Sequence, residues 1–201
     1  MKSQLRQYRP AATELRQLSD SWTARWPGVE PISYDLRRSA QETWVRFHSL
    51  PGSKRHASNE QEYRILLERH RTLLSELGAA SEVYLIAAGT WIAGDRAQRP
   101  KKDNHPGARL WRTLAPSDST AFCVPIRLNV NKVPARSGWL SPFLRAVADE
   151  RLTYAIIVPT NVAWLYHPYD GGGDVIAPTV EIRDRLVAAH PDWLSSHQSG
   201  L

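Results

Sequence analysis

The sequence predicts a single α+β domain in which helices pack on a mixed or largely antiparallel sheet. The chain has 201 residues, and its hydrophobic fraction of 42% with eight tryptophans is sufficient for one packed core. Between residues 153 and 178, strand-like segments follow one another with tight turns and no intervening helix. Consecutive strands joined in this way must be antiparallel. We assign residues 1–30 to an N-terminal helical segment and residues 31–201 to the α+β domain.

The N-terminal half contains two helical patterns. Apolar residues at helical spacing predict a first helix that ends at Pro27-Gly28: Leu15, Leu18, Trp22 and Trp26. Residues 58–78 predict a longer helix, with Ser58 and Gln61 as a capping box and Gly78 as the C-terminal cap. Its apolar stripe consists of Tyr63, Leu66, Leu67, Leu73, Leu74 and Leu77. His70 lies on this stripe, and we interpret it as a hydrogen-bonded core histidine rather than a ligand.

Two shorter helices are expected in the C-terminal half. The segment "WLSPFLRAVADE" predicts a helix with Ser141 as its cap and Pro142 at its first position. The segment "TVEIRDRLVAAHPDWL" predicts a final helix that Thr179 caps and Pro191 interrupts.

The expected strands are apolar or alternating runs bounded by turn residues. "TWVRFHSL" alternates and ends at Pro51-Gly52, whereas "EVYLIAAGTW" is apolar enough for a buried strand. "TAFCVPIRLNV" is a further strand, in which Pro125 predicts an edge or a bulge. Between the last two runs, residues at about 94–109 are polar and basic and predict a mobile loop.

The charge is distributed unevenly along the chain. The net charge is +6, yet the residues from Arg151 onward hold three basic and five acidic side chains, so the first 150 residues carry +8. This excess favours an anionic partner, such as nucleic acid, an acidic protein or phosphates. Six cations of the basic loop, which Trp91 and Trp111 flank, could follow a phosphate backbone: Arg96, Arg99, Lys101, Lys102, Arg109 and Arg112. Core packing of the two tryptophans is the alternative interpretation.

Neither targeting nor disulfide chemistry is evident in the sequence. No apolar run approaches the length of a bilayer span, and the first 20 residues lack the apolar centre of a secretory signal. The single cysteine, Cys123, excludes an intrachain disulfide and a cysteine-based zinc cluster. We therefore expect a protein of a reducing, bacterial-type cytoplasm that does not bind a membrane.

The segment "WLYHPYDGGGDVIAP", residues 164–178, is the most patterned part of the chain. Its glycines predict a hairpin turn that uses positive φ angles, fixed by Asp170 and Asp174. Alternatively, the two aspartates and His167 could bind a metal or act as acid and base. Two carboxylates are too few for calcium, however, and the lysine of a phosphate-binding loop is missing. We expect no metal and no cofactor.

A second polar segment, "RFHSLPGSKRH", concentrates cations and hydroxyl groups that suit anion binding, although a solvated loop has the same composition. It contains no nucleophile elbow, and we assign no catalytic residue. The candidate binding residues of the two segments are Arg46, His48, Ser49, Lys54, Arg55, Tyr166, His167, Asp170 and Asp174.

The chain resembles an uncharacterised bacterial family of single-domain cytosolic proteins over residues 44–195. The resemblance rests on Arg46-Phe47, Glu62-Tyr63 through Arg69-His70, Glu82-Val83-Tyr84, Asp170 to Ile176, and Asp192-Trp193-Leu194. The chain departs from the family pattern in its third hairpin glycine and its long basic loop. The resemblance implies a fold, but no activity.

Three functions remain open. Abundant aromatic and arginine side chains without a catalytic signature favour a non-enzymatic protein-binding module, regulatory or similar to immunity proteins, with a partner that could be acidic. The first alternative is a nucleic-acid-binding protein that uses the basic loop. The second is a hydrolase or transferase acting on a phosphorylated ligand, in which the sheet would bring together His48, Arg55, His167 and Asp170.

Overall fold

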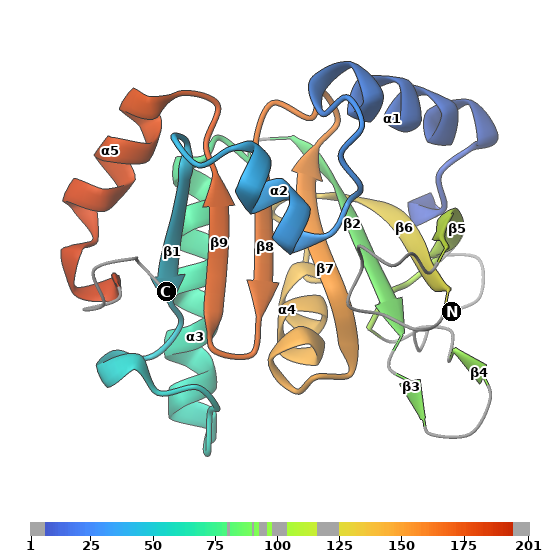
Figure 1. Ribbon diagram of the computed structural model, residues 1–201. Coiled ribbons are helices and arrows are strands. Elements are labelled where there is room, and N and C mark those ends of the chain that lie inside the picture. Colours follow the sequence, from blue (N-terminus) through green and yellow to red (C-terminus); the bar gives the residue numbers. More distant parts are fainter. Residues whose placement is uncertain are drawn as a thin grey trace.

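A computed structural model describes residues 7–79, 81–89, 91–92, 96–97, 104–115 and 125–194 (Figure 1). The helices are α1 (Ala12–Arg25), α2 (Ser33–Ser39), α3 (Glu60–Glu76), α4 (Leu140–Ala148) and α5 (Val180–Ala189). The strands are β1 (Trp44–His48), β2 (Glu82–Gly89), β3 (Trp91–Ile92), β4 (Arg96–Ala97), β5 (Arg109–Leu114), β6 (Ile126–Pro134), β7 (Leu152–Pro159), β8 (Leu165–Tyr169) and β9 (Gly172–Ile176). Two short 3-10 turns span Pro51–Ser53 and Pro191–Trp193.

Seven strands form one sheet in the order β1-β9-β8-β7-β2-β6-β5, and β3 pairs with β4 separately. Every neighbouring pair in the large sheet is antiparallel. The predicted α+β class is therefore confirmed. The first strand of the sheet, β1, pairs with the last, β9, so this edge is closed by residues far apart in the chain.

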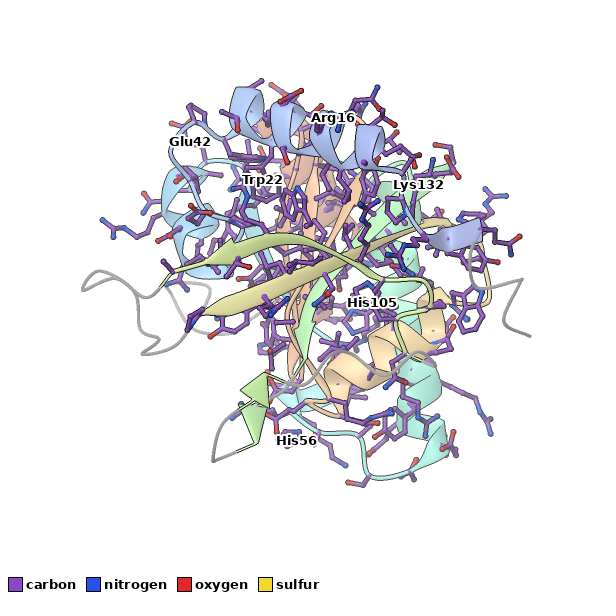
Figure 2. The ribbon with its side chains drawn as sticks, turned by 90° about the vertical axis from the view of Figure 1, so that its right-hand side faces the viewer. Arg16, Trp22, Glu42, His56, His105 and Lys132 are labelled. Carbon is purple, nitrogen blue, oxygen red and sulfur yellow. The ribbon has the colours of Figure 1, made fainter. Side chains whose placement is uncertain are left out.

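Helices cover both faces of the sheet (Figures 1 and 2). On one face, Leu18 and Trp22 of α1 and Leu36 of α2 pack on side chains of β2, β6 and β7. On the other face, α3 and α4 pack on the alternate side chains of the same strands, with Leu73 and Phe143 among the buried contacts. The hydrophobic core thus consists of two layers, one on each side of the sheet.

Two helix starts differ from the prediction by one or two residues. The cap of α3 is Asn59, whose side chain accepts a hydrogen bond from the Glu62 amide at 3.0 Å, and Ser58 instead donates its own amide to Glu62. The cap position of α4 is Trp139, so Pro142 is the third helical residue rather than the first. Proline is tolerated there because first-turn amides have no partner within the helix. The predicted caps Gly78, with φ of 82°, and Thr179 are confirmed.

Three elements were not anticipated from the sequence. Strand β4 has only two residues and lies within the segment that was predicted as a loop. Helix α2 is only seven residues long, and β5 carries cations among its apolar residues, so neither has a clear hydrophobic period. The segment before β5 also differs from a purely polar loop, because Asn104 and His105 are buried. His105 lies between the sheet and α4, where its Nε2 atom is 2.9 Å from the Leu85 carbonyl oxygen and its ring meets Phe143 edge-on.

The predicted hairpin is present as β8–β9, but the expected reason for its glycines is wrong. None of Gly171, Gly172 and Gly173 has a positive φ. The glycines instead permit close approach. A Cβ atom on Gly173 would lie within 3.0 Å of the Tyr166 ring, and one on Gly172 would lie within 3.0 Å of the Phe47 carbonyl oxygen.

This difference predicts unequal effects of alanine at two neighbouring glycines. Gly173→Ala should destabilise the fold by about 1–3 kcal/mol, because the new methyl group collides with the buried Tyr166 ring. Gly171→Ala, whose Cβ would meet Arg55 Cγ at an ordinary 3.4 Å, should change stability by less than about 0.5 kcal/mol. Chemical denaturation of both variants measures the difference. Equal destabilisation would show that turn conformation, rather than space, requires the glycines.

Candidate functional site

A polar surface interrupts the apolar face of the sheet at its β1–β9–β8 edge. Cross-strand pairing places Arg46 opposite Asp174 and Asp174 opposite His167, and the next row holds His48, Gly172 and Tyr169. Their side chains lie on the face that α1 and α2 cover. We call Arg46, His48, His167, Tyr169 and Asp174 the hairpin face. In Figure 1, α2 lies over the upper part of β8 and β9, whereas the turn of the hairpin extends below it.

The central contact of the hairpin face is a bidentate ion pair. Arg46 Nε donates to Asp174 Oδ1 at 2.7 Å, and Arg46 Nη2 donates to Asp174 Oδ2 at 3.0 Å. The Arg46 guanidinium also lies 5.3 Å from the centre of the Tyr169 ring. Burial acts to lower the pKa of Arg46, but the hydrogen bonds and charge of Asp174 outweigh it and leave the pKa raised. The arginine thus stays charged and fully engaged with one carboxylate.

The two histidines of this surface are held in the neutral form. Burial lowers the pKa of His48, and the positive charge of Arg46 lowers it further. Burial also lowers the pKa of His167, although the Asp174 carboxylate opposes this shift. Because both pKa values lie below the ordinary 6.5, neither imidazole adds a positive charge at neutral pH.

A second ion pair holds the tip of the hairpin. Arg55 Nε donates to Asp170 Oδ2, and His56 Nε2 lies 3.9 Å from the same oxygen. The Ser49 amide donates to the Gly171 carbonyl at 3.1 Å. The segment that follows β1 therefore folds back onto the turn between β8 and β9. His56 and Tyr169 also belong to this arrangement, although neither was among the candidates, because the β1–β9 pairing brings Tyr169 close to Arg46 and His56 close to Asp170.

The structure does not unite all the candidate binding residues. Tyr166 lies on the opposite face of the sheet, fully buried, with its hydroxyl against His70 Nδ1. Lys54 is paired with Glu62 at 2.6 Å, and Ser49 is buried. The remaining candidates, Arg46, His48, Arg55, His167, Asp170 and Asp174, lie on or beside the hairpin face.

Tyr166 and His70 form a buried polar contact beneath Gly173. Burial lowers the pKa of His70 to about 3 and raises that of Tyr166 well above its ordinary value. Both side chains are therefore neutral, as a core histidine requires. This confirms the interpretation of His70 as a hydrogen-bonded residue of the core.

The candidates for nucleic-acid binding are only partly described. Arg99, Lys101 and Lys102 lie outside the described residues, and Arg96 belongs to β4. Arg112 of β5 is paired with Glu30 at 3.1 Å, and β5 also carries Arg109. Trp111 packs against Trp22 and donates its indole N–H to Ser19 at 2.9 Å. The core-packing interpretation therefore applies to Trp111.

The C-terminal Asp192-Trp193-Leu194 segment packs against the outer edge of β1. Phe47 forms an isolated bridge with Leu194, and the Arg69 guanidinium lies 4.9 Å from the Trp193 ring centre while donating to the His48 carbonyl oxygen at 2.9 Å. Three of the segments that carried the family resemblance thus meet at one edge of the sheet, directly behind the hairpin face.

Asp170 and Asp174 are each engaged in an ion pair with an arginine. Among the described residues, no group of three or more histidine, cysteine or acidic side chains could hold a metal ion. No helix in the described part of the chain is long and apolar enough to cross a membrane.

Removing the charge of Asp174 should destabilise the fold. Asp174→Asn should cost about 2–4 kcal/mol, because it leaves the mostly buried Arg46 guanidinium without its carboxylate. Glu30→Gln is the matched control, since Glu30 is half-exposed in its pair with Arg112, and it should cost less than about 1 kcal/mol. Urea denaturation at pH 7 compares the two. Equal losses would contradict a structural role for the Arg46–Asp174 pair.

Burial of His70 predicts a loss of stability in mild acid. An unfolded histidine titrates near pH 6.5, whereas the pKa of folded His70 is about 3, so only the unfolded chain takes up this proton between those values. Stability is therefore highest above pH 6.5 and falls as the pH decreases towards 3. From pH 7 to pH 5 this proton costs about 2 kcal/mol. In His70→Leu, the decrease measured by urea denaturation should be smaller by that amount.

The control for this experiment is His56→Leu at an exposed position, which should retain the wild-type decrease. An unchanged pH dependence in His70→Leu would mean that His70 is protonated in the folded protein.

Comparison with known proteins supports the family resemblance and adds no named relative. No curated protein and no solved structure matches the chain. The profile of a family described as a domain of unknown function (DUF3885) matches residues 32–198, a range that contains the whole hairpin face, while α1 precedes it. Because the match covers most of the length of the chain, the chain belongs to the DUF3885 family.

Proposed function

We propose that this protein is a non-enzymatic binding module of the cytoplasm, and that Arg55 and His56, at the tip of the hairpin that the Arg46–Asp174 pair holds in place, contact an acidic segment of a partner protein. The main support for the proposal is that the arginines and aspartates of this site neutralise one another. Arg46 and Arg55 hold Asp174 and Asp170, so the surface consists of aromatic, imidazole and guanidinium groups fixed on a rigid hairpin. A surface fixed in advance loses little conformational entropy when a partner binds.

The exposed side chains at the hairpin tip suit an acidic contact. The side chain of Arg55 is 67% exposed and that of His56 is 58% exposed, beside Asp170, which is mostly buried. Arg55 contacts Asp170 through Nε, which leaves its terminal nitrogens available as donors to a carboxylate. Arginine is enriched among residues that dominate binding energy, and Arg55 is exposed at this tip. The positive net charge of the whole chain favours the same class of partner.

Two alternatives have less support. A hydrolase or transferase would need a carboxylate free to orient His48 or His167, and both nearby aspartates hold arginines. A nucleic-acid-binding protein would use the basic segment that runs into β5, and on β5 Trp111 packs into the core and Arg112 pairs with Glu30. A regulatory or immunity-like role in a bacterial cell is compatible with a binding module, and identification of the partner would decide it.

Site-specific photo-crosslinking in the native lysate tests the proposal. A photoreactive residue at position 56 should yield one discrete adduct with an acidic protein, and Arg55→Glu should abolish it by reversing the charge beside that position. The matched control carries the photoreactive residue at Thr113, an exposed position on β5 at the other edge of the sheet. It should give no such adduct. Nuclease-sensitive adducts at position 113, with none at 56, would instead favour the nucleic-acid alternative.

A further inference from the structure

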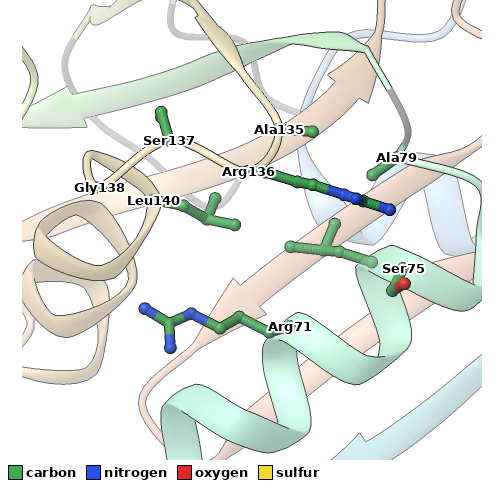
Figure 3. A pocket seen from close by; sticks show the side chains of 9 residues that line it. Arg71, Ser75, Ala79, Ala135, Arg136, Ser137, Gly138 and Leu140 are labelled. Carbon is green, nitrogen blue, oxygen red and sulfur yellow. The ribbon is translucent and has the colours of Figure 1, made fainter.

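Two clefts follow one another along the exposed side of α3. The first has a volume of about 350 Å³ and lies between the C-terminal half of α3 and the loop that joins β6 to α4 (Figure 3). The second has a volume of about 520 Å³ and continues along α3 towards its start. Because the two clefts share Arg71 and Ser75, they form one groove, which we call the α3 groove.

The residues of α3 that line this groove recur at a spacing of seven. Arg64 and Leu67 line the second cleft. One heptad later, Arg71 and Leu74 line the first. Seven residues make about two turns of an α-helix, so both pairs lie along one side of α3. Both arginines are exposed, whereas Leu67 is partly buried and Leu74 almost fully buried. Apolar residues at heptad spacing with charged residues beside them are typical of a contact between two helices.

The charge of the α3 groove is mainly positive. Arg136 adds a third cation from the β6–α4 loop, and Figure 3 shows that it and Arg71 extend in opposite directions. None of the three arginines has a carboxylate within ion-pair distance among the described residues, although Arg71 donates to the Ser141 hydroxyl. Glu68 is the one acidic residue among the described residues that line the groove. Because the cations are spread along the groove, they suit several acidic side chains of one partner segment rather than a single anion.

We propose that the α3 groove binds an acidic amphipathic helix of a partner protein. Apolar residues of that helix, seven positions apart, would lie over Leu67 and Leu74. Acidic residues beside them would contact Arg64 and Arg71, and Arg136 would contact a further acidic residue near one end of the helix. A second copy of this chain suits the groove less well, because two α3 helices side by side would bring the arginines of both copies together.

The α3 groove is separate from the hairpin tip of the proposed function. Arg55 and His56 lie against Asp170 at the turn between β8 and β9. The groove residues belong to α3, to the β6–α4 loop and to the start of α4. Binding in the groove can therefore be measured whether or not the tip binds a partner.

Titration of a fluorescent peptide with the protein, followed by fluorescence anisotropy, tests this inference. The peptide is about three heptads long, with leucine along one face and glutamate on both sides of the leucines. We expect saturable binding that weakens as the salt concentration rises. Arg64→Glu combined with Arg71→Glu should weaken binding by at least about tenfold, because it turns two attractive contacts into repulsive ones. The matched control, Arg16→Glu combined with Arg127→Glu at exposed positions on α1 and β6, should bind as the wild type does.

Two further peptides separate the charge of the helix from its apolar face. A peptide with lysine in place of each glutamate, and one with the same composition in scrambled order, should each bind at least about tenfold more weakly. Equal binding of the scrambled peptide, equal binding by the Arg64→Glu/Arg71→Glu variant, or no saturable binding at all would overturn the proposal. A wild-type dimer in analytical ultracentrifugation that the same two substitutions dissociate would also overturn it, because a second copy would then occupy the groove.

Discussion

The bidentate ion pair between Arg46 and Asp174 joins the first strand of the sheet to the last. It lies on a mostly buried surface, so each partner requires the other: either charge alone would be left without sufficient hydration. The pair fixes β1 against the β8–β9 hairpin and places Tyr169 against the guanidinium group. The second pair, Arg55 with Asp170, then holds the segment after β1 over the hairpin tip. The shape of the hairpin face follows from these two contacts.

The glycines of the hairpin support the same surface because they allow neighbouring groups to pack closely. Gly173 makes room for the Tyr166 ring on the side of α3, and Gly172 brings the hairpin close to the Phe47 backbone. Tyr166 meets His70 behind the sheet, while Arg69, the neighbour of His70, contacts Trp193 and the end of β1. Four of the five segments that carry the family resemblance therefore support the β1 edge, and the fifth, Glu82-Val83-Tyr84, lies on β2.

Local patterns in the sequence predicted most elements of the fold, including α3, its cap Gly78 and the β8–β9 hairpin. They did so because helix periodicity, caps and turns depend on neighbours in the chain. The organisation of the site was not predictable in this way. Arg46 and Asp174 lie 128 residues apart, and nothing in the local pattern of either strand specifies that they pair. Tyr166 and Tyr169 lie on opposite faces because they are three residues apart on one strand, but strand pairing decides that Tyr166 is the one that lies beneath α3.

The central claim is that Arg46 and Asp174 shape the hairpin face by holding each other and do not themselves act on a ligand. A charge exchange, Arg46→Asp combined with Asp174→Arg, tests it most directly. The account predicts that the exchanged protein recovers stability relative to either single variant and still gives the photo-crosslinked partner adduct from position 56. If the exchanged protein recovered its stability but gave no adduct from position 56, the partner would recognise one of these two side chains itself. That result would contradict a purely structural role for the pair.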